Sequence, residues 1–327
     1  MSAAPGTAQA VVQAGGQPAA RLMARLEHRL EELATGHGEQ LGRHAGEMLA
    51  AGGKRLRPLL LFLAAGAPPP ESDQLLRAAV AVELVHSATL VHDDVLDGSP
   101  LRRGRPTVMA AGGRLAATAT GDLLFSRAFA ELVRSRSAPA VRVLSRASSE
   151  LAAGELMQRA DAWQAVAPQR YLERCRLKTG VLVRAACELG ALVGRAGDEQ
   201  WVAGLAEFGE RIGVAFQLLD DVLDVTGPPE RTGKPQGADL LDGTVNLPLI
   251  IARDRDPALA AVQLRSVLTA GDAAAICGRI AGTGALEQVR GQALDLVHTA
   301  KLALPEMPDR QRAALLLIAD GVVERYS

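Results

Sequence analysis

The sequence is poor in aromatic side chains: it contains five Phe, two Tyr and two Trp in 327 residues. Alternating runs of β-branched and aromatic residues, which are typical of β-strands, are correspondingly scarce. Neither charge is in excess, because 36 Lys and Arg stand against 37 Asp and Glu. A chain without a positive balance has no electrostatic reason to bind nucleic acid, so that class of function is disfavoured.

Cysteine is rare and unpaired. The three cysteines, Cys175, Cys187 and Cys277, form no C-x-x-C pair, so the sequence indicates neither a disulfide framework nor a thiolate metal site. Free cysteines in apolar surroundings fit a reducing compartment, and we expect a cytoplasmic protein.

Long hydrophobic runs are also missing. No stretch reaches the roughly 18 charge-free apolar residues of a membrane span, so we expect no transmembrane segment. Residues 1–20 contain neither Lys nor Arg and lack the apolar core of a secretory signal. We expect them to form a disordered N-terminal tail.

The abundant residues are Ala, Leu, Val, Arg and Glu, and apolar residues recur at spacings of three and four, the period of an α-helix. The periodic segments are 22–33, 75–91, 115–133, 141–157, 171–193, 201–225 and 286–304. Several are apolar on more than one side, which is typical of helices buried within a bundle. We therefore predict a single all-α domain over residues 21–327. It is expected to be one large bundle of about ten or more helices around a central elongated cavity.

The most prominent motif is HDDVLD at residues 92–97. On a helix, Asp93 and Asp97 are four residues apart, so both carboxylates leave the same face and their repulsion calls for a cation. Carboxylate oxygens suit Mg²⁺, which takes one or two of them together with phosphate oxygens and water. Asp94 is rotated by about 100°, where it is better placed to support the ligands. A solvated acidic helix end is the competing interpretation.

The same pattern returns in FQLLDDVLD at residues 216–224. Gln217, Asp220 and Asp224 fall on one helical face, at positions i, i+3 and i+7. Both acidic triplets follow apolar helical runs, which is an unusual place for purely solvated charge. Two copies in one chain therefore favour a metal-binding function.

Short basic clusters accompany the acidic motifs. They are GGKRLRP at residues 52–58, Arg102-Arg103, Lys178 beside Thr179, and Lys234 in GKPQGAD. Each alone is consistent with a surface charge, and Arg102 and Arg103 also with the dipole of a helix end. Acidic and basic groups together are what a substrate with two diphosphates and bridging metal ions requires.

With GGKRLRP, LVHSATLVHDDVLDGSPLRRGRPT, KTG, FQLLDDVLD and GKPQGADLLDGTVNLPLI in this order, the chain resembles the trans-isoprenyl diphosphate synthase (polyprenyl synthetase) family. The resemblance covers residues 22–327 and is greatest to medium- and long-chain members. It implies the isoprenoid synthase fold, usually homodimeric, and a prenyltransferase. Such an enzyme condenses isopentenyl diphosphate head-to-tail with dimethylallyl, geranyl, farnesyl or geranylgeranyl diphosphate. The expected product is a linear, long-chain trans-polyprenyl diphosphate.

The resemblance also implies roles for individual residues. Asp93 and Asp97 are expected to bind two Mg²⁺ ions on the allylic diphosphate and Asp220 a third. The supporting acidic residues are Asp94, Asp221, Asp224 and Asp239. The cations expected on the allylic diphosphate are Arg102, Lys178 and Lys234, and those on isopentenyl diphosphate are Lys54, Arg57, His86 and Arg103. Thr179 and Gln217 are expected to line the reacting centre.

Helical spacing by itself supports one of these assignments. His86, Thr89, Asp93 and Asp97 lie at i, i+3, i+7 and i+11, so His86 shares the stripe of the metal-facing carboxylates. A lone histidine on a helix is more often structural, and its place in this stripe reverses that preference.

Product length is expected to depend on the residues before the first acidic motif. Short-chain members of the family commonly carry an aromatic residue four or five positions before the first aspartate. Those positions here hold Thr89 and Ala88, and Val85 farther back is not bulky either, which favours a long product. The floor of the cavity is alternatively formed from another helix, for which the candidates are Phe125, Phe129 and Leu144.

The chain departs from the family pattern at Thr244 and Asn246, where members often have Lys and Thr. The missing lysine removes one cation near a diphosphate. Two other functions fit in part. A class I terpene cyclase normally has one aspartate-rich motif and a later Asn/Ser/Glu motif, and a non-catalytic subunit of a heteromeric synthase usually has eroded motifs. Both acidic motifs are intact here, so we expect the synthase.

Overall fold

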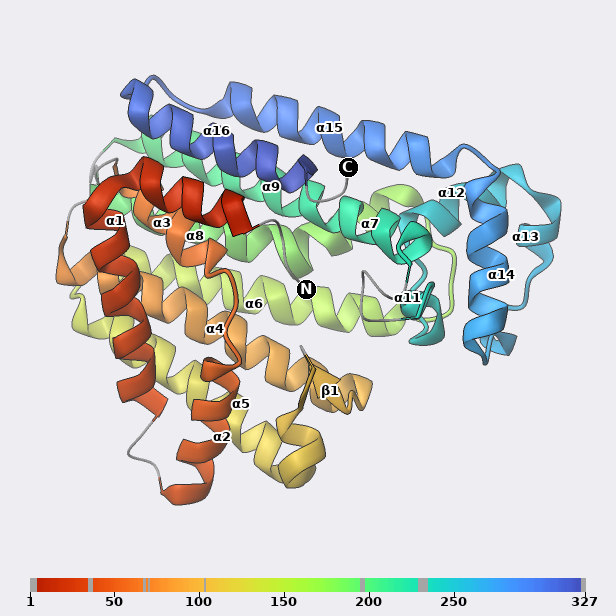
Figure 1. Cartoon of the computed structure of the whole chain (residues 1–327), viewed down its shortest axis with the longest axis horizontal. Helices are drawn as coiled ribbons and strands as arrows, with labels where there is room; N and C mark the ends of the chain where they lie inside the picture. Colours follow the sequence, from red (N-terminus) through yellow and green to blue (C-terminus); the bar gives the residue numbers. More distant parts are fainter. Residues whose placement is uncertain are drawn as a thin grey trace.

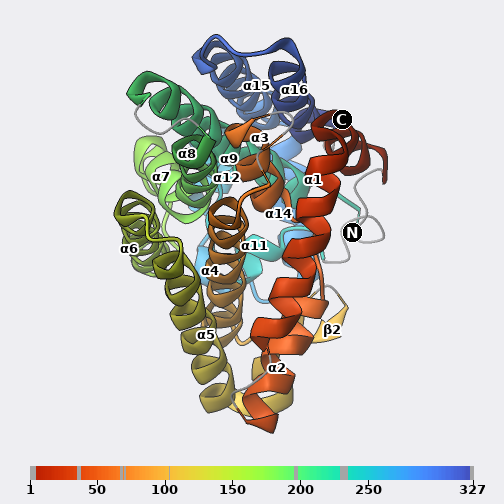
Figure 2. The same cartoon turned by 90° about the vertical axis from the view of Figure 1, so that its left-hand side faces the viewer.

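The computed structural model describes residues 5–34, 38–66, 69, 71–102, 104–194, 198–228 and 235–324, with side chains from residue 12 onward. This part of the chain is almost entirely α-helical, as Figures 1 and 2 show, and the predicted all-α class is confirmed. Its strands are β1 (Leu101–Arg102) and β2 (Arg105–Pro106), which pair antiparallel just after the first acidic motif.

The helices of the first half are α1 (Pro5–Ala34), α2 (Glu39–Ala50), α3 (Leu56–Ala65), α4 (Asp73–Asp97), α5 (Val108–Arg134), α6 (Ala138–Ala160), α7 (Pro168–Cys175) and α8 (Val181–Gly194). Those of the second half are α9 (Glu199–Thr226), α11 (Ala238–Leu241), α12 (Leu247–Arg255), α13 (Pro257–Ala261), α14 (Ala270–Ala281), α15 (Ala285–Ala303) and α16 (Asp309–Glu324). A π-helical turn, Arg176–Gly180, joins α7 to α8, and a 3-10 turn covers Leu264–Ser266.

Polar side chains fix the starts of the long helices. In each case the side-chain oxygen of the residue before the helix accepts a hydrogen bond from a backbone N–H three residues on. These residues are Ser72 for α4, Thr107 for α5, Ser137 for α6, Asp198 for α9 and Asn246 for α12. Each such cap stabilises its helix by about 1 kcal/mol.

Helix α4 runs through the core. It packs along α5 and against α3 and α8, while α9 packs between α8 and α15. Its middle turns, from Ala78 to Val85, are fully or almost fully buried, which explains why its sequence is apolar on every side. α4 is also long and apolar enough to cross a membrane, but 72% of the apolar window is buried, and core helices meet the same criterion.

The N-terminal segment differs from the prediction. Helix α1 begins at Pro5, so the disordered tail predicted for residues 1–20 is wrong from residue 5 onward. The segment is rich in alanine, the best helix former, and it docks on α16. Ala19 is fully buried, and Arg310 of α16 donates from Nε to the carbonyl of Ala14 at 3.0 Å.

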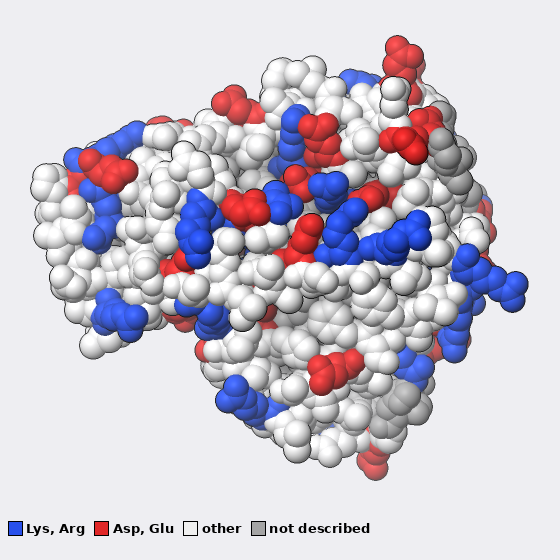
Figure 3. All heavy atoms as spheres, turned by 180° about the vertical axis from the view of Figure 1, so that it is seen from behind, with Lys and Arg blue, Asp and Glu red and all other residues white. Residues whose placement is uncertain are grey.

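The charged surface agrees with the near-neutral composition. Figure 3 shows basic and acidic side chains interspersed across the face opposite to that of Figure 1, without a large area of one sign. The three cysteines are free and buried, as expected. The mixed charge gives no indication of a nucleic-acid-binding surface on the face shown in Figure 3.

Candidate active site

The first acidic motif occupies the last turns of α4, which ends at Asp97 and is followed by Gly98 in the left-handed conformation (φ 62°). Asp93 is partly buried, and burial is the main reason that its pKa is raised to about 6. Glu155 and Asp97 raise this pKa further, whereas Lys178 and Arg102 lower it. Asp93 therefore lies among charges of both signs, at a position where a bound cation would stabilise the carboxylate.

This pKa has a consequence for stability. Because the pKa of Asp93 is higher in the folded chain than the usual 3.8, protonation favours the fold, and this contribution is lost as the pH rises through about 6. Asp93→Asn is therefore expected to stabilise the metal-free protein at about pH 8, with a gain that shrinks toward pH 4. Urea unfolding of both proteins across this range measures the difference. A gain that is independent of pH would contradict the assignment.

Asp94 faces away from the Asp93–Asp97 side, as the helical period predicts. Its side chain is buried, and Arg102 of β1 donates from Nε to its Oδ1 at 2.7 Å, while Arg102 Nη2 forms an ion pair with the same oxygen at 2.7 Å. Burial raises the pKa of Asp94, and the bond from Arg102 opposes this effect. Asp94 thus anchors the β1–β2 hairpin against the end of α4, and it holds Arg102 beside the motif.

Asp97 is paired with a residue that the sequence reasoning missed. Arg159, in the last turn of α6, donates from Nη2 to Asp97 Oδ1 at 2.6 Å. Its Nε bonds Glu155 Oε1 at 3.1 Å, and Glu155 Oε2 pairs with Lys178 Nζ at 2.7 Å. The available signal was weak: Glu155 and Arg159 are four residues apart on a helix, a spacing that also occurs in ordinary surface ion pairs.

Lys178 and Thr179 lie in the π-helical turn between α7 and α8, a type of turn that is frequent at functional sites. Helix α6 approaches this turn closely. A Cβ atom on Gly154 would lie 3.0 Å from the backbone nitrogen of Lys178, so only glycine permits the approach that brings Glu155 to Lys178. Thr179 Oγ1 donates to Gln217 Oε1 on α9 at 3.0 Å.

The second acidic motif lies near the end of α9. Asp221 is buried, and its carboxylate accepts hydrogen bonds from the Tyr171 hydroxyl and from Gln217 Nε2, the latter at 3.0 Å. Burial, followed by the charge of Asp239, raises the pKa of Asp221 well above its usual range, and these two bonds oppose the rise. Asp221 therefore orients Gln217 within the protein. The neighbouring Asp220 is exposed to solvent.

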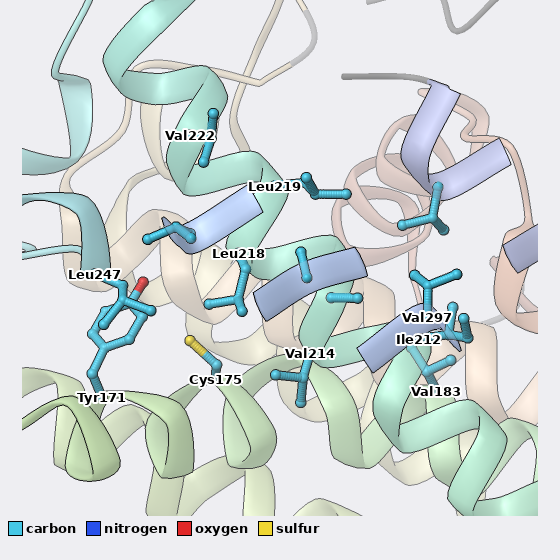
Figure 4. Close-up of a cluster of buried hydrophobic side chains, with 14 of the residues drawn as sticks. Tyr171, Cys175, Val183, Ile212, Val214, Leu218, Leu219, Val222, Leu247 and Val297 are labelled. Atoms are coloured by element: carbon cyan, nitrogen blue, oxygen red, sulfur yellow. The ribbon is translucent and has the colours of Figure 1, made fainter. Parts of the chain in front are cut away.

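Tyr171 and Arg174 of α7 are further residues that the sequence did not single out. Figure 4 shows Tyr171 beside Leu247 of α12, near the apolar side chains of α9. The guanidinium of Arg174 stacks on the Tyr171 ring at 4.6 Å and donates to the carbonyl of Val245 at 2.9 Å. In the sequence nothing distinguishes Arg174 from its charged neighbours Glu173 and Arg176, so only the packing of α7 on α9 reveals the place of Tyr171 and Arg174 beside the second motif.

The segment after the second motif folds back onto it. The backbone N–H of Asp239 donates to Asp224 Oδ1 at 3.3 Å, and that of Gly237 donates to the Asp224 carbonyl at 2.9 Å. Thr244 N–H donates to the Asp239 carbonyl at 2.8 Å. Asn246, one of the two departures from the family pattern, caps α12 through its Oδ1, which gives it a structural role.

The glycine-flanked basic cluster forms the loop before α3. Arg55 is buried there in the left-handed conformation (φ 46°), and its guanidinium bonds Glu27, the Leu49 carbonyl and Glu83 of α4. Glu83 lies one turn before His86, so this contact brings the loop with Lys54 next to the His86 part of α4. Arg57 lies in the first turn of α3.

The remaining predicted residues are distributed as follows. Val85 and Ala88 are fully buried in one hydrophobic cluster with Leu144, and Phe125 and Phe129 pack against it. Thr89 donates from its hydroxyl to the His86 carbonyl at 2.8 Å. Two predicted cations, Arg103 and Lys234, lie outside the described residues.

Within the described ranges, no three His, Cys, Asp or Glu side chains are close enough together to hold a metal ion by themselves. Mg²⁺ does not require such a cluster, because it usually takes one or two carboxylates and completes its shell with substrate phosphates and water. The partly buried Asp93, whose charge is poorly compensated, is a suitable ligand of this kind. The residues present therefore fit a metal that arrives with a diphosphate.

Comparison with known proteins identifies the chain. Residues 39–276 match the sequence model of the polyprenyl synthetase family. Heptaprenyl diphosphate synthase component 2 of Geobacillus stearothermophilus is 40% identical over 268 residues, which is 81% of this chain and 83% of that protein. Octaprenyl diphosphate synthase of Escherichia coli is 34% identical over 285 residues, 85% of this chain and 88% of that protein.

Solved structures agree. A polyprenyl synthase from Caulobacter crescentus, complexed with calcium and isoprenyl diphosphate, superposes with a TM-score of 0.89 at 35% identity, covering 97% of this chain and 98% of the other. A decaprenyl diphosphate synthase from Rhodobacter capsulatus gives a TM-score of 0.87 at 33% identity, covering 98% and 99%. The chain belongs to the polyprenyl synthetase family and is a trans-prenyltransferase that makes isoprenyl diphosphates.

Proposed function

We propose that the enzyme elongates an allylic diphosphate with isopentenyl diphosphate between the two acidic motifs and releases a long-chain polyprenyl diphosphate. The observation that carries this proposal is a chain of polar contacts from one motif to the other. Asp97, Arg159, Glu155 and Lys178 form its first part. Thr179, Gln217, Asp221 and Tyr171 form its second part. The two parts meet at the adjacent residues Lys178 and Thr179, so the π-helical turn Arg176–Gly180 contacts both sets of side chains.

In the proposed site, Asp93 and Asp97 hold two Mg²⁺ ions and Asp220 holds a third. Bound Mg²⁺ supplies the positive charge that stabilises the departing diphosphate. Asp94 supports this site through Arg102, and Asp221 supports it through Gln217. Asp224, at the end of the second motif, and Asp239, in the segment that folds back onto it, support the motif, and the Asp239 backbone N–H donates to Asp224 Oδ1.

The protein's cations bind the two substrates. Arg102 and Lys178, together with Lys234, hold the allylic diphosphate. Lys54, Arg57, His86 and Arg103 hold isopentenyl diphosphate. The allylic C–O bond breaks and its electron pair leaves with diphosphate. The double bond of isopentenyl diphosphate then forms the new C–C bond, and a proton passes to the departing diphosphate, since no side chain stands out as a base.

Thr179 and Gln217 line the reacting centre in this proposal. Their mutual hydrogen bond and the bond from Gln217 to Asp221 fix the orientation of the Gln217 amide. A fixed side chain at this position orients the substrates without reorganisation during the reaction.

The test of this function uses the purified chain with Mg²⁺, labelled isopentenyl diphosphate, and dimethylallyl, geranyl, farnesyl or geranylgeranyl diphosphate in turn. Chromatography after dephosphorylation measures product length. Elongation to long linear products supports the proposal, and cyclic hydrocarbons would indicate a cyclase. Failure to elongate any primer would contradict a self-sufficient enzyme.

A second candidate function is that of one subunit of a heteromeric synthase, because a relative at 40% identity is named as component 2 of such an enzyme. We propose instead a homodimer that works alone, since both acidic motifs and the basic loop are present. Exposed apolar side chains on α5 and α6, such as Leu115 and Leu156, are suited to a second copy. Light scattering measures the oligomeric state.

Product length is expected to shorten in Ala88→Phe. Ala88 is fully buried five residues before Asp93, in the cluster that contains Val85 and Leu144, so a phenyl ring there narrows the space for the growing chain. We expect products shorter by one or more five-carbon units. Ala81→Phe, two turns farther along the same face, is expected to allow longer products than Ala88→Phe. Thermal melts check folding, because such overpacking costs about 1–3 kcal/mol, and equal product lengths in all three proteins would contradict the assignment.

A further inference from the structure

Helix α6 presents a charged pair to the proposed metal site that belongs to none of the motifs. Glu155 and Arg159 lie one turn apart, and their side chains are 18% and 39% exposed. Arg159 joins Asp97, a proposed metal ligand, and Glu155 joins Lys178, a proposed diphosphate ligand. The Glu155–Arg159 pair therefore contacts both a proposed metal ligand and a proposed diphosphate ligand.

The Arg159–Asp97 contact occupies one oxygen of a carboxylate that is proposed to bind metal. Arg159 Nη2 lies 2.6 Å from Asp97 Oδ1, so the guanidinium neutralises this carboxylate in the ligand-free protein. If a metal ion were held by that oxygen, the Nη2 donor would lose its acceptor. Glu155 still holds Arg159 by its Nε, at 3.1 Å, and the guanidinium stays beside the first motif.

The freed donors would then be available to the diphosphate of a substrate bound at the first motif. A guanidinium carries five N–H donors in a planar fork, which matches phosphate oxygens and binds them through charge-assisted hydrogen bonds. Only part of this fork is used by Glu155. If a metal ion bound Asp97, Arg159 would lose this acceptor. The diphosphate bound with the metal at Asp93 and Asp97 would provide new acceptors.

We propose that Arg159 is a further diphosphate-binding residue of this enzyme. It pairs with Asp97 in the ligand-free protein and transfers its hydrogen bonds to the allylic diphosphate when metal ions occupy the first motif. This inference rests on the proposed metal-binding role of Asp93 and Asp97. The ordinary alternative is a surface ion pair at a helix end, where a cation is favoured by the helix dipole and contributes little.

The test measures binding of inorganic diphosphate by isothermal titration calorimetry, with saturating Mg²⁺ and again with a chelator. The difference in affinity between the two titrations measures the binding that depends on Mg²⁺. This binding is assigned to the first motif, and the binding that remains with the chelator is assigned to the basic isopentenyl site. Arg159→Gln is expected to weaken this binding about 10- to 100-fold, because a hydrogen bond to a charged group is lost. Arg159→Lys keeps the positive charge but not the planar guanidinium, and its affinity for diphosphate is expected to fall less than that of Arg159→Gln.

The matched control is Arg146→Gln. Arg146 lies on the same helix, about 20 Å from Arg159 by helical rise, and pairs with Glu188 at the same distance, 2.6 Å. It is expected to bind diphosphate like the wild type. Unchanged or tighter binding in Arg159→Gln, with normal binding by the wild type, would overturn the inference alone. A wild-type protein without Mg²⁺-dependent binding would instead contradict the proposed function.

Discussion

Asp93→Asn is expected to lower kcat by about 1000-fold or more while the protein remains folded. The substitution keeps the shape of the side chain and removes the negative charge that the proposed metal ions require. Loss of several kcal/mol of charge stabilisation in the transition state corresponds to a rate loss of this size. Rapid-quench measurement of a single turnover with saturating substrates isolates the chemical step from product release.

The fold is expected to tolerate this change because a charged carboxylate at position 93 lowers the stability of the metal-free protein. Burial raises the pKa of Asp93 to about 6, which means that the charged form is disfavoured when no metal is bound. A neutral amide of the same size removes this cost. The circular dichroism spectrum and melting temperature are therefore expected to match or exceed those of the wild type.

A suitable control is Asp122→Asn on α5. Asp122 is 69% exposed and lies 3.4 Å from His92, next to the same motif, but it faces solvent. We expect near-normal turnover. If Asp93→Asn kept activity within about tenfold of the wild type, a difference of only 1.4 kcal/mol, the metal assignment would be wrong.

Helical periodicity predicted how the side chains of the first acidic motif are arranged around α4. The spacing of Asp93 and Asp97 placed them on one side of α4 and turned Asp94 away, and Asp94 indeed pairs with Arg102 instead. Such predictions succeed because the residues belong to a single helix, whose geometry depends only on local sequence. The all-α class was predictable for the same reason, since it follows from the period of the apolar residues.

The contacts between helices were not predictable in this way. Arg159 meets Asp97, and Tyr171 meets Asp221, across 62 and 50 positions of sequence. These contacts depend on how closely two helices approach, and that depends on glycines such as Gly154, whose purpose appears only in the packed structure. Residues 5–20 of helix α1 were not predicted to be helical, because the stability of this part comes from docking on α16 as well as from propensity.

The basic loop illustrates the same limit. In the sequence, Lys54, Arg55 and Arg57 look alike, and the family resemblance assigned diphosphate binding to the first and the last. In the structure Arg55 is buried, and it ties the loop to α4 through Glu83. The left-handed backbone at Arg55 costs about 1–2 kcal/mol for a residue with a side chain, so its three partners must stabilise this conformation.

Arg55→Met is accordingly expected to destabilise the protein by about 3–5 kcal/mol, the usual cost of removing one partner from a buried ion pair. The Glu83 side chain is 5% exposed and would be left without its cation. Urea unfolding measures this change. In the folded fraction, the KM for isopentenyl diphosphate is expected to rise more than that for the allylic substrate, because Lys54 belongs to the freed loop. Arg21→Met, which breaks an exposed pair with Glu71, is expected to produce a much smaller loss.

A double variant separates the two effects of Arg55. Arg55→Met combined with Glu83→Met removes both charges of the buried pair, and replacing both partners by apolar side chains is often close to neutral. The double variant is therefore expected to recover much of the stability lost in Arg55→Met. Its KM for isopentenyl diphosphate should stay high, since the contact that ties the loop to α4 is still missing. Recovery of both quantities would mean that Arg55 stabilises the fold without positioning the loop.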